Sequence, residues 1–475
     1  MSSRPEWRSK TWRPLSGLLA IVLFAALGAA QAAAQSWSAP AALGQSSLYY
    51  MYGNNVAVAV SSHPLAQSVA VWVEPTTMAV KYAIQRNGKW TGTKTVYTAN
   101  ANAAEEVTDP QVVIDQSGVA TAVFGSTKQG PVTYCVSGGR VVRCRQLVSF
   151  AKVATLAPGA STWSKANLSA QGWTVTDAQI GLDQAGNALA LWSHRATSAS
   201  APTLLSASRP AGGAWTAPVS VYTSAAMSLP RLSVGPSGAA EAVWAEPLAG
   251  TPTSYAVRAS FNPAGGIWGA PETVATQATP VAYLRSTVDG NGQAAVVWNN
   301  GYSVQLAQRN GAWSSPETLV SAPGRVYAGS GPYAAYGPSV ASDGPGNVLV
   351  SWLESDVAGG KTIEAEVIPA TGTRSHVFWP TGAGVEPNLS MSPDGSLGML
   401  AWLDEDDSNA YAVSFTPGVG WGQPLLMSSG AAQYAAVWGT GASIAAGPNR
   451  SATAVWLSVA GINAQIQILA SGYLP

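Results

Sequence analysis

One phrase returns along the whole chain. "DQAGNALALW", Asp183 to Trp192, has near-copies in which a turn with aspartate and glycine precedes a short apolar segment ending in a large aromatic residue. The aromatic residues that end these segments are Trp72, Phe124, Trp192, Trp244, Trp298, Trp352, Trp402 and Trp456. A recurrence of this kind along most of the chain predicts a fold made of repeated structural units.

Each repeat contains four short apolar segments separated by turns. Gln111 to Asp115 is a first segment, "VATAVF" a second, Val304 to Arg309 a third, and a Gly-x-Trp phrase such as "GAWSSPETLV" opens a fourth. Four short strands in a unit of about 50 residues are typical of a β-propeller blade. The 49 glycines and 31 prolines fit an all-β chain with many turns. We predict an all-β β-propeller of eight four-stranded blades, with seven as the alternative.

The repeated turn has a physical role. Four turns pair an aspartate with a glycine three residues later: Asp115 with Gly118, Asp183 with Gly186, Asp289 with Gly292, and Asp343 with Gly346. We expect each aspartate to accept bonds from backbone amides ahead of it and each glycine to adopt a positive φ. The segment that follows is apolar on both faces, which predicts burial between neighbouring blades.

The two ends of the chain predict how the ring closes. The last repeat has three strands and stops at Pro475, whereas the segment Ser36 to Gly44 precedes the first repeat. If this N-terminal strand completes the last blade, the ring has no open edge.

Residues 1–34 are typical of a secretory signal peptide. Arg4, Arg8, Lys10 and Arg13 precede an apolar run that starts at Leu15, and small residues follow at 32–34. The run is shorter than the roughly 20 residues of a membrane span, although an uncleaved anchor is the alternative. We therefore expect 35–475 to be a single propeller domain, secreted or periplasmic, with no membrane span after cleavage.

The charge of the chain argues against nucleic acid as a partner. Residues 1–34 hold four of the 24 basic residues and one of the 24 acidic residues, so the remaining chain is weakly acidic. Nucleic-acid binding calls for a basic stripe.

The repeat resembles those of bacterial secreted propellers of the broad sialidase-like, BNR-like group. The resemblance implies a propeller fold, and it leaves the activity open because such proteins include sugar hydrolases, lyases, lectins and scaffolds. The sialidase Asp-box, Ser-x-Asp-x-Gly-x-x-Trp, is not met, because "SPDGSLGMLAW" has Ser392 and Asp394 but no glycine at the required place.

Long insertions between strands fall on one face of the expected disc, called here the long-loop face. A rigid scaffold tolerates variation on such a face, which favours it as the binding face. The candidate ligand-binding aromatic residues there are Tyr49, Tyr50, Tyr52, Trp173, Tyr283, Tyr327, Tyr333, Tyr336, Tyr434 and Trp438. Such rings stack on sugars or anchor a protein partner. The alternative is that they pack the loops beneath them.

Polar residues form two further candidate series. The first lies where the inner strands begin: Gln111, Gln179, Arg231, Arg285, Ser339 and Asn388. Arg231 and Arg285 in adjacent blades are suited to hold a carboxylate. The second lies two residues after each strand-ending aromatic: Glu74, Ser126, His194, Glu246, Asn300, Glu354, Asp404 and Ser458. We expect His194, Glu246 and Glu354 to bind sugar hydroxyls; solvation or local ion pairing is the alternative for both series.

Cysteine and histidine usage gives one structural expectation. Cys135 and Cys144 flank an expected hairpin that turns at Gly139 and Arg140, which places them opposite each other and predicts a disulfide in an oxidising compartment. The dispersed His63, His194 and His376 predict no zinc site, and the acidic run 404–407 lacks the spacing of a calcium loop. We expect no metal and no cofactor.

These features favour a secreted, monomeric binding protein that recognises carbohydrate on its long-loop face. A cell-envelope scaffold for a protein partner is one alternative, and a polysaccharide hydrolase or lyase is another. No catalytic residue stands out.

Overall fold

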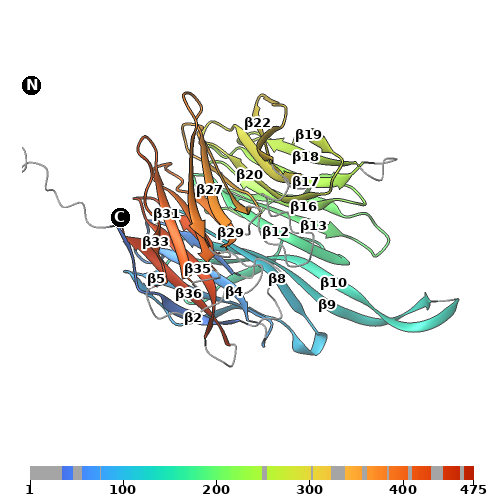
Figure 1. Ribbon diagram of the computed structural model, residues 1–475. Coiled ribbons are helices and arrows are strands. Elements are labelled where there is room, and N and C mark those ends of the chain that lie inside the picture. The colour runs from blue at the N-terminus through green and yellow to red at the C-terminus, as the bar shows by residue number, and fades with distance from the viewer. Residues whose placement is uncertain are drawn as a thin grey trace, which may run out of the picture.

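The computed structural model is an all-β ring of eight antiparallel blades with almost no helix (Figure 1). It describes residues 35–46, 56–74, 76–137, 139–248, 254–300, 303–321, 337–355, 361–381, 384–404, 409–428, 442–460 and 465–474. The expected eight-bladed propeller is confirmed, and the seven-bladed alternative is not.

The first four blades follow one another along the chain. Blade 1 contains β3 (Val56–Val60), β4 (Ser68–Glu74), β5 (Ala79–Arg86), β6 (Lys89–Trp90) and β7 (Lys94–Thr98). Blade 2 contains β8 (Glu106–Ile114), β9 (Ala120–Ser137), β10 (Arg140–Leu156) and β11 (Ser164–Asn167). Blade 3 contains β12 (Thr174–Leu182), β13 (Ala188–Arg195), β14 (Thr203–Arg209) and β15 (Val219–Thr223). Blade 4 contains β16 (Ser228–Val234), β17 (Ala240–Pro247), β18 (Tyr255–Asn262) and β19 (Glu272–Gln277).

The remaining blades complete the ring. Blade 5 contains β20 (Val281–Val288), β21 (Ala294–Asn300), β22 (Ser303–Asn310), β23 (Ala312–Trp313) and β24 (Glu317–Ser321). Blade 6 contains β25 (Ser339–Ser342), β26 (Val348–Ser355), β27 (Lys361–Ile368) and β28 (Ser375–Thr381). Blade 7 contains β29 (Gly384–Met391), β30 (Gly398–Asp404), β31 (Asn409–Thr416), β32 (Gly420–Trp421) and β33 (Leu425–Leu426). Blade 8 contains β34 (Ser443–Ala446), β35 (Ala452–Ala460), β36 (Gln465–Leu474), β1 (Ser36–Trp37) and β2 (Ala41–Ser46).

The N-terminal strands close the ring as predicted. β36 pairs with β35 on one side and with β1 and β2 on the other, with Ser36 opposite Leu474 and Ala41 opposite Ala470. The last blade therefore combines the two ends of the described chain, and its outer strand comes from the N-terminal side.

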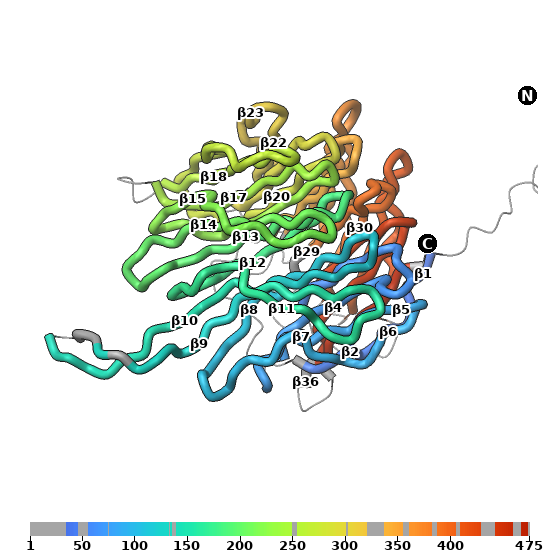
Figure 2. Tube along the Cα trace, turned by 180° about the vertical axis from the view of Figure 1, so that it is seen from behind, coloured from blue at the N-terminus to red at the C-terminus, as the bar shows by residue number. Residues whose placement is uncertain are grey.

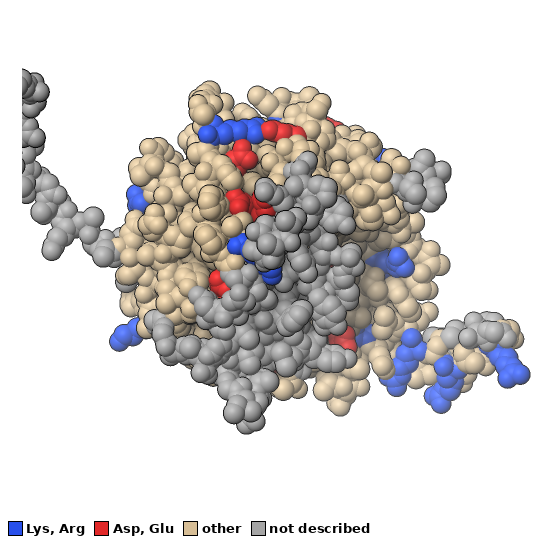
Figure 3. Space-filling model, in the orientation of Figure 1, with Lys and Arg blue, Asp and Glu red and all other residues tan. Residues whose placement is uncertain are grey.

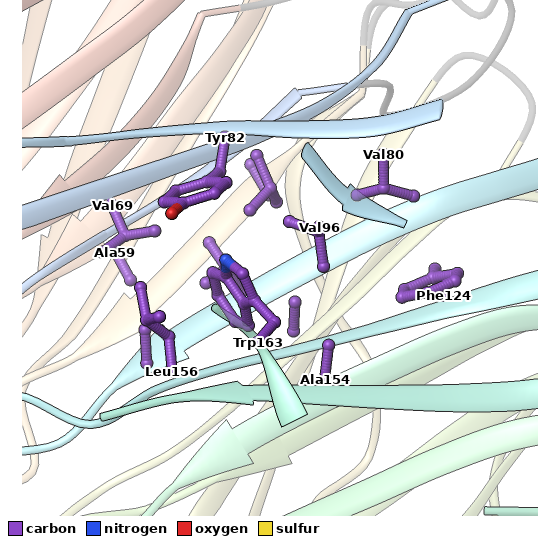
Figure 4. Packing of buried hydrophobic residues seen from close by; sticks show 14 of the residues in the cluster. Ala59, Val69, Val80, Tyr82, Val96, Phe124, Ala154, Leu156 and Trp163 are labelled. Carbon is purple, nitrogen blue, oxygen red and sulfur yellow. The ribbon is translucent and has the colours of Figure 1, made fainter. Parts of the chain in front are cut away.

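The core consists of the sheets packed face to face. All eight strand-ending aromatic residues are at most 4% exposed, and Trp244 is 0% exposed. Between blades 1 and 2, Tyr82 meets Trp163 edge to face at 5.3 Å, within a cluster that both blades supply (Figure 4). The second strand of each blade is apolar on both sides because each side packs against a neighbouring strand layer.

The aspartate turns are as expected from the sequence. The Oδ1 atoms of Asp115 and Asp183 accept bonds from the amides of Val119 and Asn187 at 2.9 and 2.8 Å. Gly186 has a φ of 86°. A Cβ there would lie 3.3 Å from the Cβ of Asp115 in the preceding blade, so glycine also allows adjacent turns to approach closely.

Helix is confined to one short element in the described residues, the 3-10 turn η2 (Ala101–Ala103). No helix in this part of the chain has the length and apolar character to cross a membrane.

Candidate functional site

Each blade's first strand, called here the inner strand, has two different ends. At the turn end, the inner strands surround a cavity of about 360 Å³ that all eight blades line. Asp115, Asp183 and Asp394 are among the lining residues. Each of these carboxylates accepts hydrogen bonds within its own turn. We therefore assign the turn end a structural role.

The opposite end of the inner strands, called here the bulge end, is irregular. In blades 2 to 5, and again in blade 7, the pairing with the second strand shifts by one residue, which defines a β-bulge. In blades 2 to 5 a residue other than glycine takes a positive φ at the same place: Asp109 (50°), Asp177 (56°), Leu229 (53°) and Tyr283 (51°). This backbone conformation costs about 1–2 kcal/mol per residue, so four adjacent blades repeat a local strain.

Charged side chains at the bulge ends of three blades interact electrostatically. Burial raises the pKa of Asp109, the negative charge of Asp177 raises it further, and the positive charge of Arg231 lowers it. Asp109, Asp177 and Arg231, called here the bulge site, are thus electrostatic neighbours although they come from β8, β12 and β16.

Two of the predicted ligand residues, Tyr283 and Arg285, lie beside the corresponding bulge of blade 5. Arg285 donates from Nη1 to the carbonyl of Leu284 at 3.1 Å, just as Arg231 donates to Pro230 at 2.9 Å. The ring of Tyr283 covers Gly337, where a Cβ would lie 2.2 Å from the Tyr283 Cβ. The pairing of Arg231 and Arg285 on one carboxylate stays a prediction.

Other members of the polar series fasten neighbouring blades together. Gln179 donates to the carbonyl of Pro230 at 2.7 Å and accepts from the amide of Leu232 at 2.8 Å. The Oγ atom of Ser339 accepts from the amide of Leu389 at 3.0 Å. These two side chains have a structural explanation.

The acidic and histidine residues predicted to bind hydroxyls lie in local networks. Glu246 accepts from the Tyr222 hydroxyl at 3.1 Å and forms an ion pair with Arg258 at 3.0 Å. His194 lies beneath Gly172, where a Cβ would be 2.5 Å from its Nε2 atom, and burial lowers its pKa.

Glu354 has a neighbour in the same blade. Its Oε2 atom accepts from the indole of Trp352 at 3.5 Å, and its charge raises the pKa of Glu364, which burial raises more strongly. Ligand binding by His194, Glu246 and Glu354 stays a prediction, and the geometry gives each of them a local structural role.

Most of the predicted aromatic contacts fall outside the described residues. These are Tyr49, Tyr50, Tyr52, Tyr327, Tyr333, Tyr336, Tyr434 and Trp438. Trp173 is described and half-buried; its amide donates to the carbonyl of Arg195 at 2.6 Å, which ties its connection to blade 3. Trp379 stacks on Trp402 at 5.8 Å, so it packs between blades 6 and 7.

The cysteine hairpin differs from the expectation by one step. Ser137 pairs with Arg140, Cys135 with Val142, and Cys144 with Thr133. The two cysteine positions are therefore diagonal neighbours in the ladder, not opposite each other. The predicted turn at Gly139 and Arg140 was wrong because Arg140 already pairs with Ser137 as part of β10. The side chain of Cys135 lies outside the described residues, so the disulfide stays a prediction.

The described residues contain no group of three or more His, Cys, Asp or Glu side chains arranged to hold a metal. The acidic run at 404–407 is described only at Asp404. Metal binding by the rest of that run stays untested.

Sequence reasoning missed the two carboxylates of the bulge site. A signal for them exists, because "VTDPQ" at 107–111 and "VTDAQ" at 175–179 repeat an aspartate at the same place in adjacent units. Asp and Asn are enriched at positive φ, so a repeated aspartate inside an apolar strand indicates a bulge.

Comparisons with known proteins give only distant structural likenesses. No family model and no curated protein matches the sequence. A protein of unknown function from Dyadobacter fermentans is similar in structure, with a TM-score of 0.40 and 13% identity over 70% of this chain and 99% of that one. A structure of puromycin hydrolase has a TM-score of 0.46 and 13% sequence identity, and the match covers 89% of this chain and 61% of that chain. A structure of polysaccharide lyase Uly1 has a TM-score of 0.42 and 9% sequence identity, and the match covers 74% of this chain and 88% of that chain.

At these identities the likeness concerns the propeller fold alone. A sialidase is also among the similar structures. Membership of the sialidase-like, BNR-like group stays a prediction.

Proposed function

We propose that this protein binds a carbohydrate at the bulge site, with Tyr283 and Arg285 at its border. The observation that carries the proposal is that Asp109 and Asp177 stand at strained bulges in the same register of adjacent blades, and that the charge of Asp177 acts on Asp109. Like charges held together at a cost in backbone strain favour a binding role over a packing role.

The chemistry of these side chains suits a sugar. Carboxylate oxygens accept bonds from neighbouring hydroxyls, a guanidinium donates to hydroxyl or carboxylate oxygens, and a tyrosine ring provides a stacking face. A few polar groups on a rigid scaffold are typical of small-molecule sites.

The test is a glycan and polysaccharide array with 35–475, followed by calorimetry on the sugars that bind. We expect Asp109→Asn and Asp177→Asn each to weaken binding about tenfold or more, because each loses a charge-assisted hydrogen bond. Asparagine tolerates positive φ, so the bulge is retained.

Glu246→Gln is the matched control. It makes the same carboxylate-to-amide change at a side chain held between Tyr222 of blade 3 and Arg258 of blade 4, and we expect unchanged binding. If Glu246→Gln abolished binding and the two aspartate variants did not, the site would lie on the strand-ending series and the bulge site would be wrong.

A polysaccharide hydrolase is the second candidate, favoured by the raised pKa of Asp109 beside a second carboxylate. Release of reducing ends from bound polysaccharide, lost in Asp109→Asn, is the measurement for it. Binding without release supports the binding protein alone.

We further propose that 1–34 directs export and that Cys135 and Cys144 form a disulfide. N-terminal sequencing of the exported protein is expected to begin at Gln35. Mass spectrometry of a non-reduced digest is expected to show the peptides of the two cysteines joined, and free thiols would contradict the disulfide.

A further inference from the structure

The hairpin of β9 and β10 projects beyond the disc (Figures 1 and 2). Its strands have 18 and 17 residues, whereas no other strand in the described part of the chain exceeds ten. β9 pairs with β8 only as far as Thr127, and β10 pairs with β11 only from Lys152 onward. The segment Lys128–Val148, called here the arm, is therefore the part of the hairpin in which β9 and β10 pair with each other and not with β8 or β11.

The arm is basic, whereas the rest of the chain has more acidic than basic residues. The sequence has no acidic residue between Asp115 and Asp177, and Lys128, Arg140, Arg143 and Arg145 lie on the arm. Figure 3 shows basic side chains gathered over this projection, at the lower right, with no acidic side chain among them on that face.

The arm also exposes apolar side chains. Tyr134 and Val141 are 72% and 71% exposed, and Val132 and Val142 are 41% and 38% exposed. Tyr134 lies opposite Arg143, and Val132 lies opposite Arg145, on the same face of the ribbon. Arginine beside exposed tyrosine and valine is typical of a binding surface, because exposing apolar side chains to water is unfavourable for a hairpin that contacts solvent alone.

The distribution of charge favours a diffuse anionic surface over a protein patch. Register and alternation place Arg140 on one face of the ribbon and Arg143 and Arg145 on the other. A specific protein interface combines both signs of charge around an apolar centre. A uniformly negative surface instead repels acidic side chains, which fits an arm that has basic residues and no acidic ones. Pro131, which has no amide hydrogen, and the flanking charges also disfavour addition of a partner strand to the edge.

We propose that the arm binds the headgroup layer of a bilayer that contains anionic phospholipids. The arginines contact lipid phosphates, while Tyr134 and the valines lie at the boundary between headgroups and acyl chains. The unpaired backbone edges keep the arm at a depth where water still reaches them, so it rests in the interface and does not span.

The experiment is co-sedimentation of 35–475 with phosphatidylcholine vesicles that contain or lack about 30% phosphatidylglycerol. We expect binding only to the anionic vesicles and its loss at about 0.5 M salt, because screening removes the attraction to the surface. Equal binding to both vesicle types, or to neither, overturns the proposal.

Two double variants with the same change in net charge provide the control. Arg143→Glu with Arg145→Glu alters the arm, and Lys89→Glu with Lys94→Glu alters exposed residues of blade 1. We expect the arm variant to lose at least about tenfold in vesicle affinity and the blade 1 variant to keep affinity within about twofold. Equal losses in both would show that overall charge, not the arm, holds the lipid, and the proposal would be wrong.

A third variant, Tyr134→Ser with Val141→Ser, tests the apolar contact without a change in charge. We expect a loss of about fivefold or more, since both exposed side chains leave water on binding. Unchanged melting temperatures establish that all variants fold. This inference is independent of the proposed sugar site, because none of these three variants changes a residue of the bulge site.

Discussion

At the turn end of the inner strands, aspartates are bonded within their turns, and glycines let neighbouring turns approach closely. At the bulge end of the same strands, the charge of Asp177 acts on Asp109, and residues other than glycine hold a positive φ. The turn end has regular turns that stabilise the ring, whereas the bulge end interrupts the strand pairing at a cost in backbone strain. In a repeat protein, strained irregularities shared by adjacent units are therefore candidates for function.

The largest change in stability is expected in the second strand of each blade, which is buried between neighbouring blades. Trp244 is fully buried between blades, so Trp244→Ala is expected to lower the free energy of unfolding by about 3–5 kcal/mol. Urea denaturation measures it. Trp173→Ala, at a half-buried residue of a blade connection, is the control with a smaller expected loss, and equal losses would contradict the assignment of the core.

Glycine at the turn end serves both conformation and packing. A Cβ on Gly238 would lie 3.0 Å from Oδ2 of Asp183, whereas one on Gly88 would meet nothing within 4 Å, and both residues have a positive φ. We expect Gly238→Ala to cost about 2–3 kcal/mol and Gly88→Ala about 1 kcal/mol. Urea denaturation measures both variants, and equal costs would show that the approach of adjacent turns adds nothing.

One buried carboxyl near the turn end breaks the regular pattern. Glu241 is fully buried at a position where blades 3 and 6 have Leu189 and Leu349. Burial raises its pKa well above the ordinary 4.5, the charge of Arg309 lowers it, and that of Glu272 raises it. The unfolded chain ionises first as pH rises, so this carboxyl lowers stability above about pH 4.5.

We therefore expect Glu241→Leu to raise the free energy of unfolding at pH 7 by about 1–3 kcal/mol. This gain in the free energy of unfolding is expected to shrink toward pH 4, where the Glu241 carboxyl carries its proton in both the folded and the unfolded chain. Urea denaturation across this pH range measures the effect, and Glu241→Gln isolates ionisation from packing. A gain that does not change with pH would contradict the role of ionisation.

The bulge end is expected to give the smallest change in stability. Asp109→Asn keeps a residue type that tolerates positive φ. It also removes a carboxyl group whose pKa is raised by burial, so we expect the free energy of unfolding at pH 7 to stay equal or to rise by less than about 1 kcal/mol. Thermal unfolding at pH 5 and 7 measures it. A loss above about 2 kcal/mol would show that Asp109 supports the fold, which would remove the contrast between the two ends.

The regular parts of this molecule could be predicted from sequence for physical reasons. The turn at Asp183 to Gly186 depends on a side chain bonding amides a few residues ahead, which is a local property repeated in several blades. The unequal ends, with a spare strand before the first repeat and a missing one after the last, left one way to close the sheet.

The irregular parts depend on contacts between distant residues. The bulge at Asp177 changes the apolar pattern little, and its one signal in the sequence is the aspartate repeated from Asp109. The bulges at Leu229 and Tyr283 lack that signal, because these are unusual residues for a positive φ. Glu246 was predicted as a ligand residue from its position after Trp244. Its partners Tyr222 and Arg258 come from other strands, so sequence spacing could not reveal them.

The closure of blade 8 makes the order of synthesis matter. Ser38 bonds through its amide to Gly472, a contact between residues more than 400 positions apart. Such a contact forms only once the last strand exists, and closing so long a loop is slow relative to pairing within a blade. A chain stalled before β36 would have seven blades assembled and an unsealed ring. Pairing of β36 with β1 and β2 is thus the step that closes the ring of blades.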